Sequence, residues 1–160
     1  MDFVEKEITI RKLRAEDADE ICEIYCLITN QHVNPDFKKM VLDRVQELER
    51  GAHFVAEFEG KVVGFMISYI LPFGFGAEEC AYIATMGVHP KFMGQRLGKG
   101  MTKKIFMFYK SRGISRVYTS VRWDSTDLLS FCKTMGFERS NYINLKRNLE
   151  PFDAGEEGEG

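Results

Sequence analysis

The sequence predicts a mixed α/β domain (an α+β mixed sheet), in which one central β-sheet carries helices on both faces. Some segments repeat apolar residues at spacings of three and four, as amphipathic helices do, whereas others form short alternating or continuous apolar runs typical of strands. These segments follow one another in the order β-α-α-β-β-β-α-β-α-β. A meander of strands followed by a βαβ-like half produces a sheet of mixed direction.

The first elements are a strand and two helices. Residues Ile8–Leu13 alternate weakly and predict a strand, and Ala15–Ile28 places its apolar residues on one helical face. Asn34 and Pro35 are a favoured cap and first residue for a second helix. We expect Gly51 to end that helix. Its expected buried stripe consists of Phe37, Met40, Val41, Val45 and Leu48.

Three strands should come next. The apolar runs His53–Phe58 and Lys61–Leu71 are joined by Glu59-Gly60, a hairpin signal. A further strand is expected over Ala81–Val88. Gly87 stands near the end of this strand, where a glycine indicates a bulge or a close backbone approach.

The last part of the chain predicts two helices and two strand segments. A glycine-rich turn leads into a helix that runs to about Arg112, and its buried face is expected to hold Leu97, Met101, Ile105, Phe108 and Tyr109. Arg116–Arg122 predicts a strand and Ser125–Met135 a helix. Phe137–Leu149 predicts a final strand or strand pair.

Length and composition indicate one globular domain over residues 1–152. The 160 residues are 44% hydrophobic and 29% charged, and 22 basic against 24 acidic residues give a formal charge of −2. Four of the acids lie in the segment 153–160 (DAGEEGEG), which we expect to be a disordered acidic tail. The near-neutral balance disfavours nucleic-acid binding, and no apolar run is long enough to span a membrane.

The cysteine content points to the cytoplasm. The start, MDFVEKE, lacks the features of a secretory signal. Cys22, Cys26, Cys80 and Cys132 are few and scattered, which is typical of reduced thiols. Cys22 and Cys26 share a helix face, but no second ligand pair accompanies them, so we expect buried thiols and no metal site.

The stretch Val88–Lys104 (VHPKFMGQRLGKGMTKK) carries the most chemical information. A strand is followed there by a glycine-rich loop and a helix start, where free backbone N–H groups bind anions. Cations at a helix start oppose the helix dipole, so a cluster of them favours a bound polyanion. The cluster consists of Lys91, Arg96, Lys99, Lys103 and Lys104. Neither a Walker-type loop nor a dinucleotide fingerprint is present.

At this point the chain resembles the GNAT superfamily of acyl-CoA-dependent N-acyltransferases. Members of that family end a strand in a pattern like V-x-P and open the next helix with R/Q-x-x-G-x-G/A, which holds the pyrophosphate of coenzyme A. This chain offers Val88-His89-Pro90 followed by the loop Met93–Gly100. A later family helix resembles Phe131–Phe137 (FCKTMGF). The resemblance spans nearly the whole chain in element order.

Two registers of the loop are open. A literal match to Q-x-x-G-x-G begins at Gln95, whereas spacing to neighbouring elements favours Met93-Gly94-Gln95-Arg96-Leu97-Gly98. We prefer the register that starts at Met93, because it keeps Leu97 and the residues that follow it on the buried helix face. Arg96 then stands where the family has a glycine and needs a tolerable backbone conformation.

The resemblance implies acetyl-CoA as co-substrate and a set of residues that bind it. In the family, the strand before the loop splays from its neighbour, and its exposed backbone binds the pantetheine arm as an added strand would. A backbone N–H near Met86 or Val88 would then polarise the acyl carbonyl. The implied cofactor-binding residues are Met86, Gly87, Val88, Gly94, Gln95, Arg96, Leu97, Gly98, Lys99, Gly100, Ser125 and Phe131.

The candidate catalytic side chains are Cys132 and Glu79. Cys132 stands where many members place a tyrosine as general acid, and Glu79 is an acid that could act through water. The run Tyr82–Met86 lacks the family's usual acids. Ser125 replaces an asparagine that often contacts coenzyme A, and it also suits a helix cap.

The implied function is transfer of an acetyl group to a primary amine by direct attack in a ternary complex. The expected partner is a small-molecule or peptide amine. The loop Pro72–Gly76 (PFGFG) reads as a mobile lid or as the contact of a homodimer. The alternative is a non-catalytic acyl-CoA-binding sensor or partner module of the same fold.

Overall fold

One five-stranded sheet organises the part of the chain that the computed structural model describes, which is residues 8–30, 32, 34–47, 50–73, 75–76, 78–94 and 96–150. Its order is the chain order: β1 (Ile8–Lys12), β2 (His53–Phe58), β3 (Lys61–Leu71), β4 (Cys80–Val88) and β5 (Val117–Thr119). The first four strands pair antiparallel, and β5 pairs parallel with β4. This mixed sheet confirms the predicted fold class.

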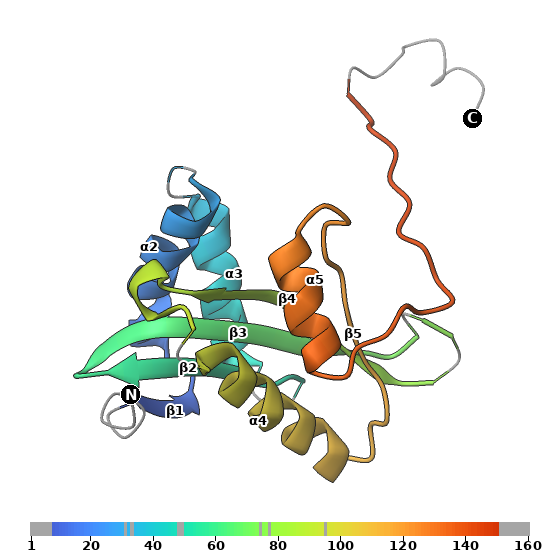
Figure 1. Cartoon of the computed structure of the whole chain (residues 1–160), viewed down its shortest axis with the longest axis horizontal. Coiled ribbons are helices and arrows are strands. Elements are labelled where there is room, and N and C mark those ends of the chain that lie inside the picture. The colour runs from blue at the N-terminus through green and yellow to red at the C-terminus, as the bar shows by residue number, and fades with distance from the viewer. Residues whose placement is uncertain are drawn as a thin grey trace.

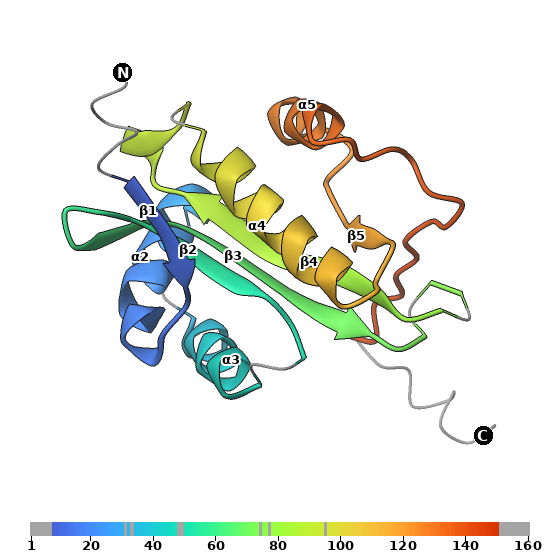
Figure 2. The ribbon, with the colours of Figure 1, turned by 90° about the horizontal axis from the view of Figure 1, so that it is seen from below.

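Helices cover both faces of the sheet, as Figure 1 and Figure 2 show. A 3₁₀ turn, η1 (Ala15–Asp17), leads into α2 (Ala18–Thr29), which packs with α3 (Pro35–Gln46) on one face. On the other face lies α4 (Leu97–Ser111). The last helix, α5 (Thr126–Thr134), lies beside the start of α4.

The predicted hairpin between β2 and β3 is confirmed. Glu59 and Gly60 both have positive φ, at 50° and 81°. Two successive left-handed residues form the turn whose twist matches that of paired strands. This short turn fixes the β2–β3 register.

A hydrogen-bonded tyrosine hydroxyl lies in the core under α4. Leu97, Met101, Ile105 and Tyr109 form the buried stripe of α4. The Tyr109 hydroxyl accepts the Ala52 amide at 3.1 Å and lies 2.7 Å from the Ser68 hydroxyl. These bonds tie the C-terminal half of α4 to β3 and to the residue before β2.

The end of α3 differs from the prediction. The Asn34 side chain accepts the Asp36 amide and caps α3 as expected, but the helix ends at Gln46 and not at Gly51. Leu48 lies outside the described residues. Gly51 has another role, because a Cβ at this position would collide with the Ser68 carbonyl oxygen. The glycine therefore permits the close approach of the chain to β3.

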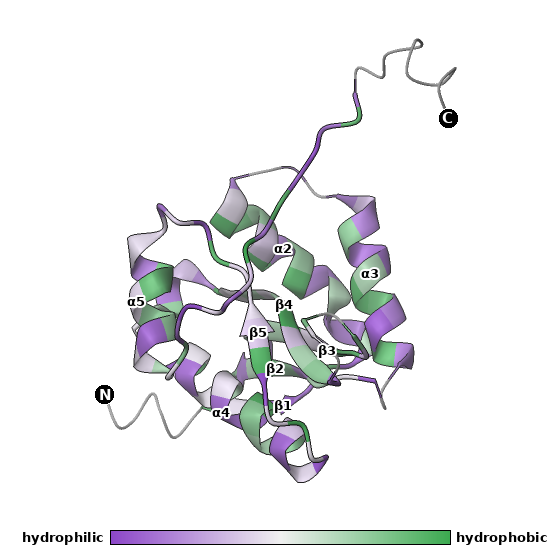
Figure 3. Ribbon diagram, turned by 90° about the vertical axis from the view of Figure 1, so that its right-hand side faces the viewer, coloured by the Kyte–Doolittle hydropathy of each residue, from purple (hydrophilic) through white to green (hydrophobic). Residues whose placement is uncertain are grey.

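The predicted strand or strand pair over Phe137–Leu149 is wrong, since the structure has no strand there. The segment is coil, and its residues Tyr142, Ile143 and Asn144 lie beside the end of β5 before the chain runs away from the sheet (Figure 3). Ile143 and Leu145 are 73% and 82% exposed. The Ser140 hydroxyl accepts the Tyr142 amide at 3.2 Å and turns the chain at this point. A segment forms a strand only where the edge of another strand pairs with it.

Candidate active site

Strands β4 and β5 separate after a few pairs and leave a gap, which we call the β4–β5 fork. The pairing extends only from Ala81↔Val117 to Ile83↔Thr119, so β5 is shorter than the predicted Arg116–Arg122. The edge of β4 from Ala84 to Val88 that faces away from β3 has no strand beside it in the described structure. An open edge of this kind accepts an extended ligand.

A bulge in β4 lies at the fork. Ile67 pairs with Thr85 and Ser68 pairs with Ile83, so Ala84 is the unpaired extra residue. Such a bulge bends a strand and increases its twist. Gly87 predicts a bulge or a close backbone approach, and the first of these two alternatives is wrong.

Gly87 is instead paired with Phe65, and the packing around it leaves no room for a side chain. A Cβ at Gly87 would lie 2.6 Å from Ile28 Cδ1 and 2.8 Å from Phe65 Cε1. The absence of a side chain therefore lets α2 pack directly on β4. No glycine or proline stands at or beside Ala84, so no residue type indicates the true bulge.

The backbone of β4 presents donors to the fork. The His89 amide donates to the Val63 carbonyl at 2.8 Å, and backbone groups alternate in direction along an antiparallel pair. Gly87 therefore faces β3, whereas Met86 and Val88 direct their N–H groups away from it. These two donors are the ones that the resemblance assigned to the pantetheine and acyl groups.

The loop before α4 is held by two residues in the left-handed region. Gly94 has a φ of 83°, and Arg96, at the N-cap of α4, has a φ of 63°. Arg96 thus adopts the conformation that favours glycine, as the Met93-start register requires. The burial of Leu97 and Met101 is also the pattern that this register predicts. Gln95 lies outside the described residues.

The start of α4 concentrates positive charge. The first N–H groups of a helix, here those of Leu97, Gly98 and Lys99, have no intrahelical acceptor. Five cations lie in the η2 turn, in the loop and in the first turns of α4, and none of the five forms an ion pair within the described residues. They are Lys91, Arg96, Lys99, Lys103 and Lys104. Free donors and unpaired cations together suit a pyrophosphate.

Helix α5 closes over this helix start. A Cβ at Gly98 would lie 3.1 Å from the Phe131 ring, so the ring rests on the bare first turn of α4. A Cβ at Gly100 would collide with Ile10 Cδ1. Ser125 occupies the N-cap position of α5, but its side chain makes no capping hydrogen bond.

The two predicted catalytic side chains lie in different places. Cys132 is 8% exposed on α5, and burial raises the pKa of its thiol. The thiol is therefore protonated at neutral pH and is a weak donor, not a nucleophile. Glu79 is exposed just before β4, seven residues from Met86, a separation of roughly 20 Å along a strand. The structure does not bring Glu79 to the fork.

His89 has a structural contact at the end of β4. Its Nδ1 accepts the Lys91 amide at 3.1 Å and caps the short 3₁₀ turn η2 (Pro90–Phe92). The ring also packs edge-on against Phe92. A capping nitrogen that is occupied by an amide is not free to act as a base.

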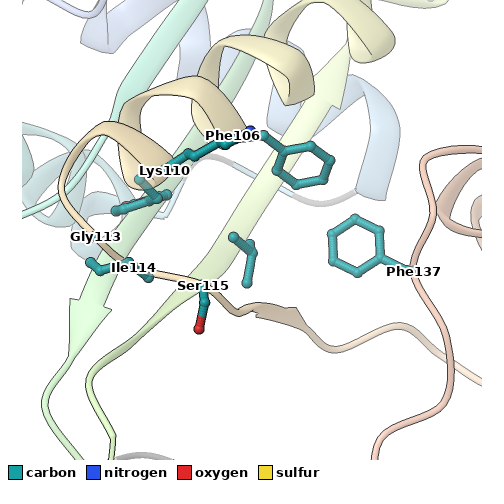
Figure 4. Close-up of a pocket in the computed structure, with 8 residues that line it drawn as sticks. Phe106, Lys110, Gly113, Ile114, Ser115 and Phe137 are labelled. Carbon is teal, nitrogen blue, oxygen red and sulfur yellow. The ribbon is translucent and has the colours of Figure 1, made fainter.

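A cavity of about 580 Å³ lies at the other end of α4 (Figure 4). Phe106 of α4 and Phe137 line it, with ring centres 5.8 Å apart. Gly113 also lines it, fifteen residues after Gly98, and a helix of that length covers about 22 Å. This cavity is therefore separate from the loop and the fork.

Among the described residues, none of the helices is long and apolar enough to cross a membrane. No group of three or more His, Cys, Asp or Glu side chains in that part of the chain is arranged to hold a metal ion.

Comparison with known proteins identifies the class to which this site belongs. The family model "Acetyltransferase (GNAT) family" matches residues 18–137. The chain therefore belongs to the GNAT acetyltransferase family, which confirms the resemblance.

Individual relatives are distant. The mycothiol acetyltransferase of Amycolatopsis mediterranei is 26% identical over 133 residues, which cover 78% of this chain and 44% of that protein. The chain thus spans less than half the length of this relative.

Solved structures share the fold. An aminoglycoside acetyltransferase from an uncultured soil metagenomic sample, in complex with sisomicin, has a TM-score of 0.77 at 19% identity, covering 92% of this chain and 99% of that one. The aminoglycoside N-acetyltransferase AAC(6')-Iy, in complex with coenzyme A, has a TM-score of 0.75 at 15% identity, covering 88% and 94%.

Proposed function

We propose that this chain is an acetyl-CoA-dependent N-acetyltransferase that acts on a primary amine by direct attack in a ternary complex. One observation carries the proposal: the open edge of β4 lies next to a helix start that has free N–H groups and unpaired cations. An extended thioester with a polyphosphate at one end requires this combination. Membership of the GNAT family supports the same function.

The loop and the helix start would hold the phosphates. The backbone N–H groups of Leu97, Gly98 and Lys99 would provide donors, and Arg96 and Lys99 would provide charge. Gly100 would not act as a donor, because its amide already donates to the Arg96 carbonyl at 3.0 Å. Phe131 would border the pantetheine channel, since its ring rests on Gly98. Ser125 has a hydroxyl that makes no cap bond and is available to the ligand.

The backbone of β4 would supply the main catalytic effect. Negative charge develops on the acyl oxygen as the amine attacks, and the N–H of Met86 or Val88 would stabilise it. In the reaction, a C–N bond forms and the C–S bond breaks. The amine nitrogen releases a proton and the leaving thiolate gains one. Cys132 is the proposed donor of that second proton, because burial keeps its thiol protonated.

The proposed setting is the cytoplasm, with residues 1–152 as one catalytic domain that uses no metal. None of the four cysteines forms a disulfide within the described residues. Reduced thiols are typical of cytosolic proteins. The acidic segment 153–160 lies outside the described residues and stays a prediction.

Two measurements test the proposal. Calorimetry should show micromolar binding of acetyl-CoA and much weaker binding of ATP. Thiol release from acetyl-CoA across a panel of primary amines should then show turnover. Binding without turnover on any amine would favour the non-catalytic module, and preference for ATP would contradict both functions.

A further inference from the structure

A second pocket, of about 290 Å³, lies on the sheet face opposite α4 and borders the β4–β5 fork. Tyr82 of β4 pairs with Tyr118 of β5, one residue before the last pair of the two strands. Ile83 packs in the core under α4, so its neighbour Tyr82 points to the opposite face. Thr119 and Ser120 also line the pocket at the fork.

The walls of this pocket are aromatic. Phe75 stacks on Tyr118 with ring centres 4.3 Å apart and meets Tyr142 edge-on at 5.7 Å. The rings of Tyr69 and Tyr82 are 5.8 Å apart. These distances fall within the range of favourable aromatic pairs. The stacking of Phe75 shows that a flat ring fits against Tyr118.

The lining of the pocket is electrically neutral, and a cation packs on one of its aromatic walls. None of its lining residues carries a charge. Arg44 places its guanidinium 4.8 Å from the centre of the Tyr69 ring. The Tyr82 hydroxyl donates to the Ser120 hydroxyl at 2.9 Å, so this polar wall is also uncharged. A polycation would find no carboxylate among these walls and would meet a guanidinium behind one of them.

We propose that this pocket binds the ring of a small arylalkylamine, whose primary amine reaches into the β4–β5 fork. This substrate class rests on the proposed N-acetyltransferase function. The volume lies at the small end of ligand pockets and suits a single ring system. From Tyr82 to Met86 the bulged strand covers roughly 10 Å, which a ring with a short alkyl amine spans.

The test compares primary-amine acceptors that differ in shape, with each rate referred to the concentration of neutral amine. Thiol release from acetyl-CoA is measured with 2-phenylethylamine, tryptamine, n-hexylamine and the polycation sisomicin. We expect kcat/KM to be about tenfold higher for the two arylalkylamines than for n-hexylamine, since two or three aromatic contacts are gained. Sisomicin should react more slowly than the arylalkylamines.

A matched pair of variants on one loop assigns this preference to the pocket. Phe75→Leu removes a ring from the pocket wall and should reduce the advantage of 2-phenylethylamine over n-hexylamine about threefold or more. Phe73→Leu changes a ring that is 77% exposed and does not line the pocket, so it should leave the ratio unchanged. Circular dichroism melting checks that both variants fold.

Binding is measured separately, so that the two proposals fail differently. Calorimetry of 2-phenylethylamine on the protein saturated with coenzyme A should show binding that Phe75→Leu weakens and Phe73→Leu does not. If this holds without turnover, the pocket stands and the enzymatic function fails. Equal turnover of n-hexylamine and 2-phenylethylamine, or no binding of 2-phenylethylamine, would overturn the arylalkylamine pocket even where acetyl transfer is intact.

Discussion

Replacement of Arg96 separates two effects of this residue, the strain of its left-handed backbone and the positive charge of its side chain. Its φ of 63° is a left-handed conformation that suits glycine, and its side chain is one of the five unpaired cations at the start of α4. A non-glycine residue in this region costs about 1 kcal/mol relative to glycine. An exposed cation on a phosphate contributes about 1 kcal/mol, or about fivefold in Kd. Arg96→Gly and Arg96→Ala should therefore weaken coenzyme A binding equally, by about fivefold. Only stability should distinguish them, with the glycine variant about 1 kcal/mol more stable than the alanine variant.

Calorimetry with coenzyme A and urea unfolding of the apoprotein measure the two effects on the same samples. Arg96→Lys is the control, since it keeps the charge and the backbone strain and should hold Kd within about twofold. The loss in affinity should shrink at high salt. Equal stability of the Gly and Ala variants would show that Arg96 is not left-handed. Unchanged affinity in both variants at low salt would refute the phosphate site.

Three further changes test other parts of the structure. Gly98→Val should weaken coenzyme A binding more than tenfold in calorimetry, because the new side chain meets the Phe131 ring. The double variant Gly98→Val with Phe131→Ala should recover part of the lost affinity. If the affinity were unchanged in both variants, coenzyme A would bind elsewhere. Tyr109→Phe should lower the free energy of unfolding by about 1–3 kcal/mol in urea titrations, because it leaves the buried Ala52 amide without its hydrogen-bond acceptor. An unchanged free energy of unfolding would mean that another group accepts this amide. His53 is 6% exposed, and burial, with a smaller contribution from a nearby arginine, lowers its pKa from 6.5 to about 4. The unfolded chain then binds more protons than the folded one between pH 6.5 and 4, so stability should fall by about 3 kcal/mol as the pH drops through this window. His53→Leu should flatten this dependence, whereas a change at the exposed His32 should not, and equal pH profiles for the wild type and His53→Leu would contradict the lowered pKa.

The fold could be predicted where a segment's local sequence pattern matched the burial of that segment in the structure. The strands His53–Phe58 and Lys61–Leu71 have the bounds that their apolar runs predict, and Glu59-Gly60 forms the expected turn. The prediction of a strand over Phe137–Leu149 is wrong, because this segment is coil in the structure. A strand depends on a partner edge, which a local pattern does not contain.

The candidate site was predictable in its backbone elements and less so in its side chains. The glycine spacing located the helix start, and Arg96 adopts the conformation that the preferred register requires. The bulge at Ala84 could not be found, because it arises from β3–β4 register and not from residue type. Glu79 was expected near the reaction, but strand length places it at the other end of β4. Tyr118 and Tyr142 are 24 residues apart in the sequence, and only the fold brings them together in one aromatic pocket.

The departures of this chain from the family pattern are consistent with a site that works mainly through its main chain. Arg96 in place of a glycine keeps the left-handed turn, so the N–H groups at the start of α4 remain free. Met86 and Val88 present their amides to the fork by strand direction alone, and their side chains do not alter this. Loss of the usual acids from Tyr82–Met86 therefore removes a means of proton transfer but leaves carbonyl polarisation in place. It follows that the proposed enzyme should depend more on the ionisation of its amine than relatives that carry a base. Its kcat/KM should rise about tenfold per pH unit below the pKa of the acceptor, and a plateau well below that pKa would reveal a base that the structure does not place at the fork.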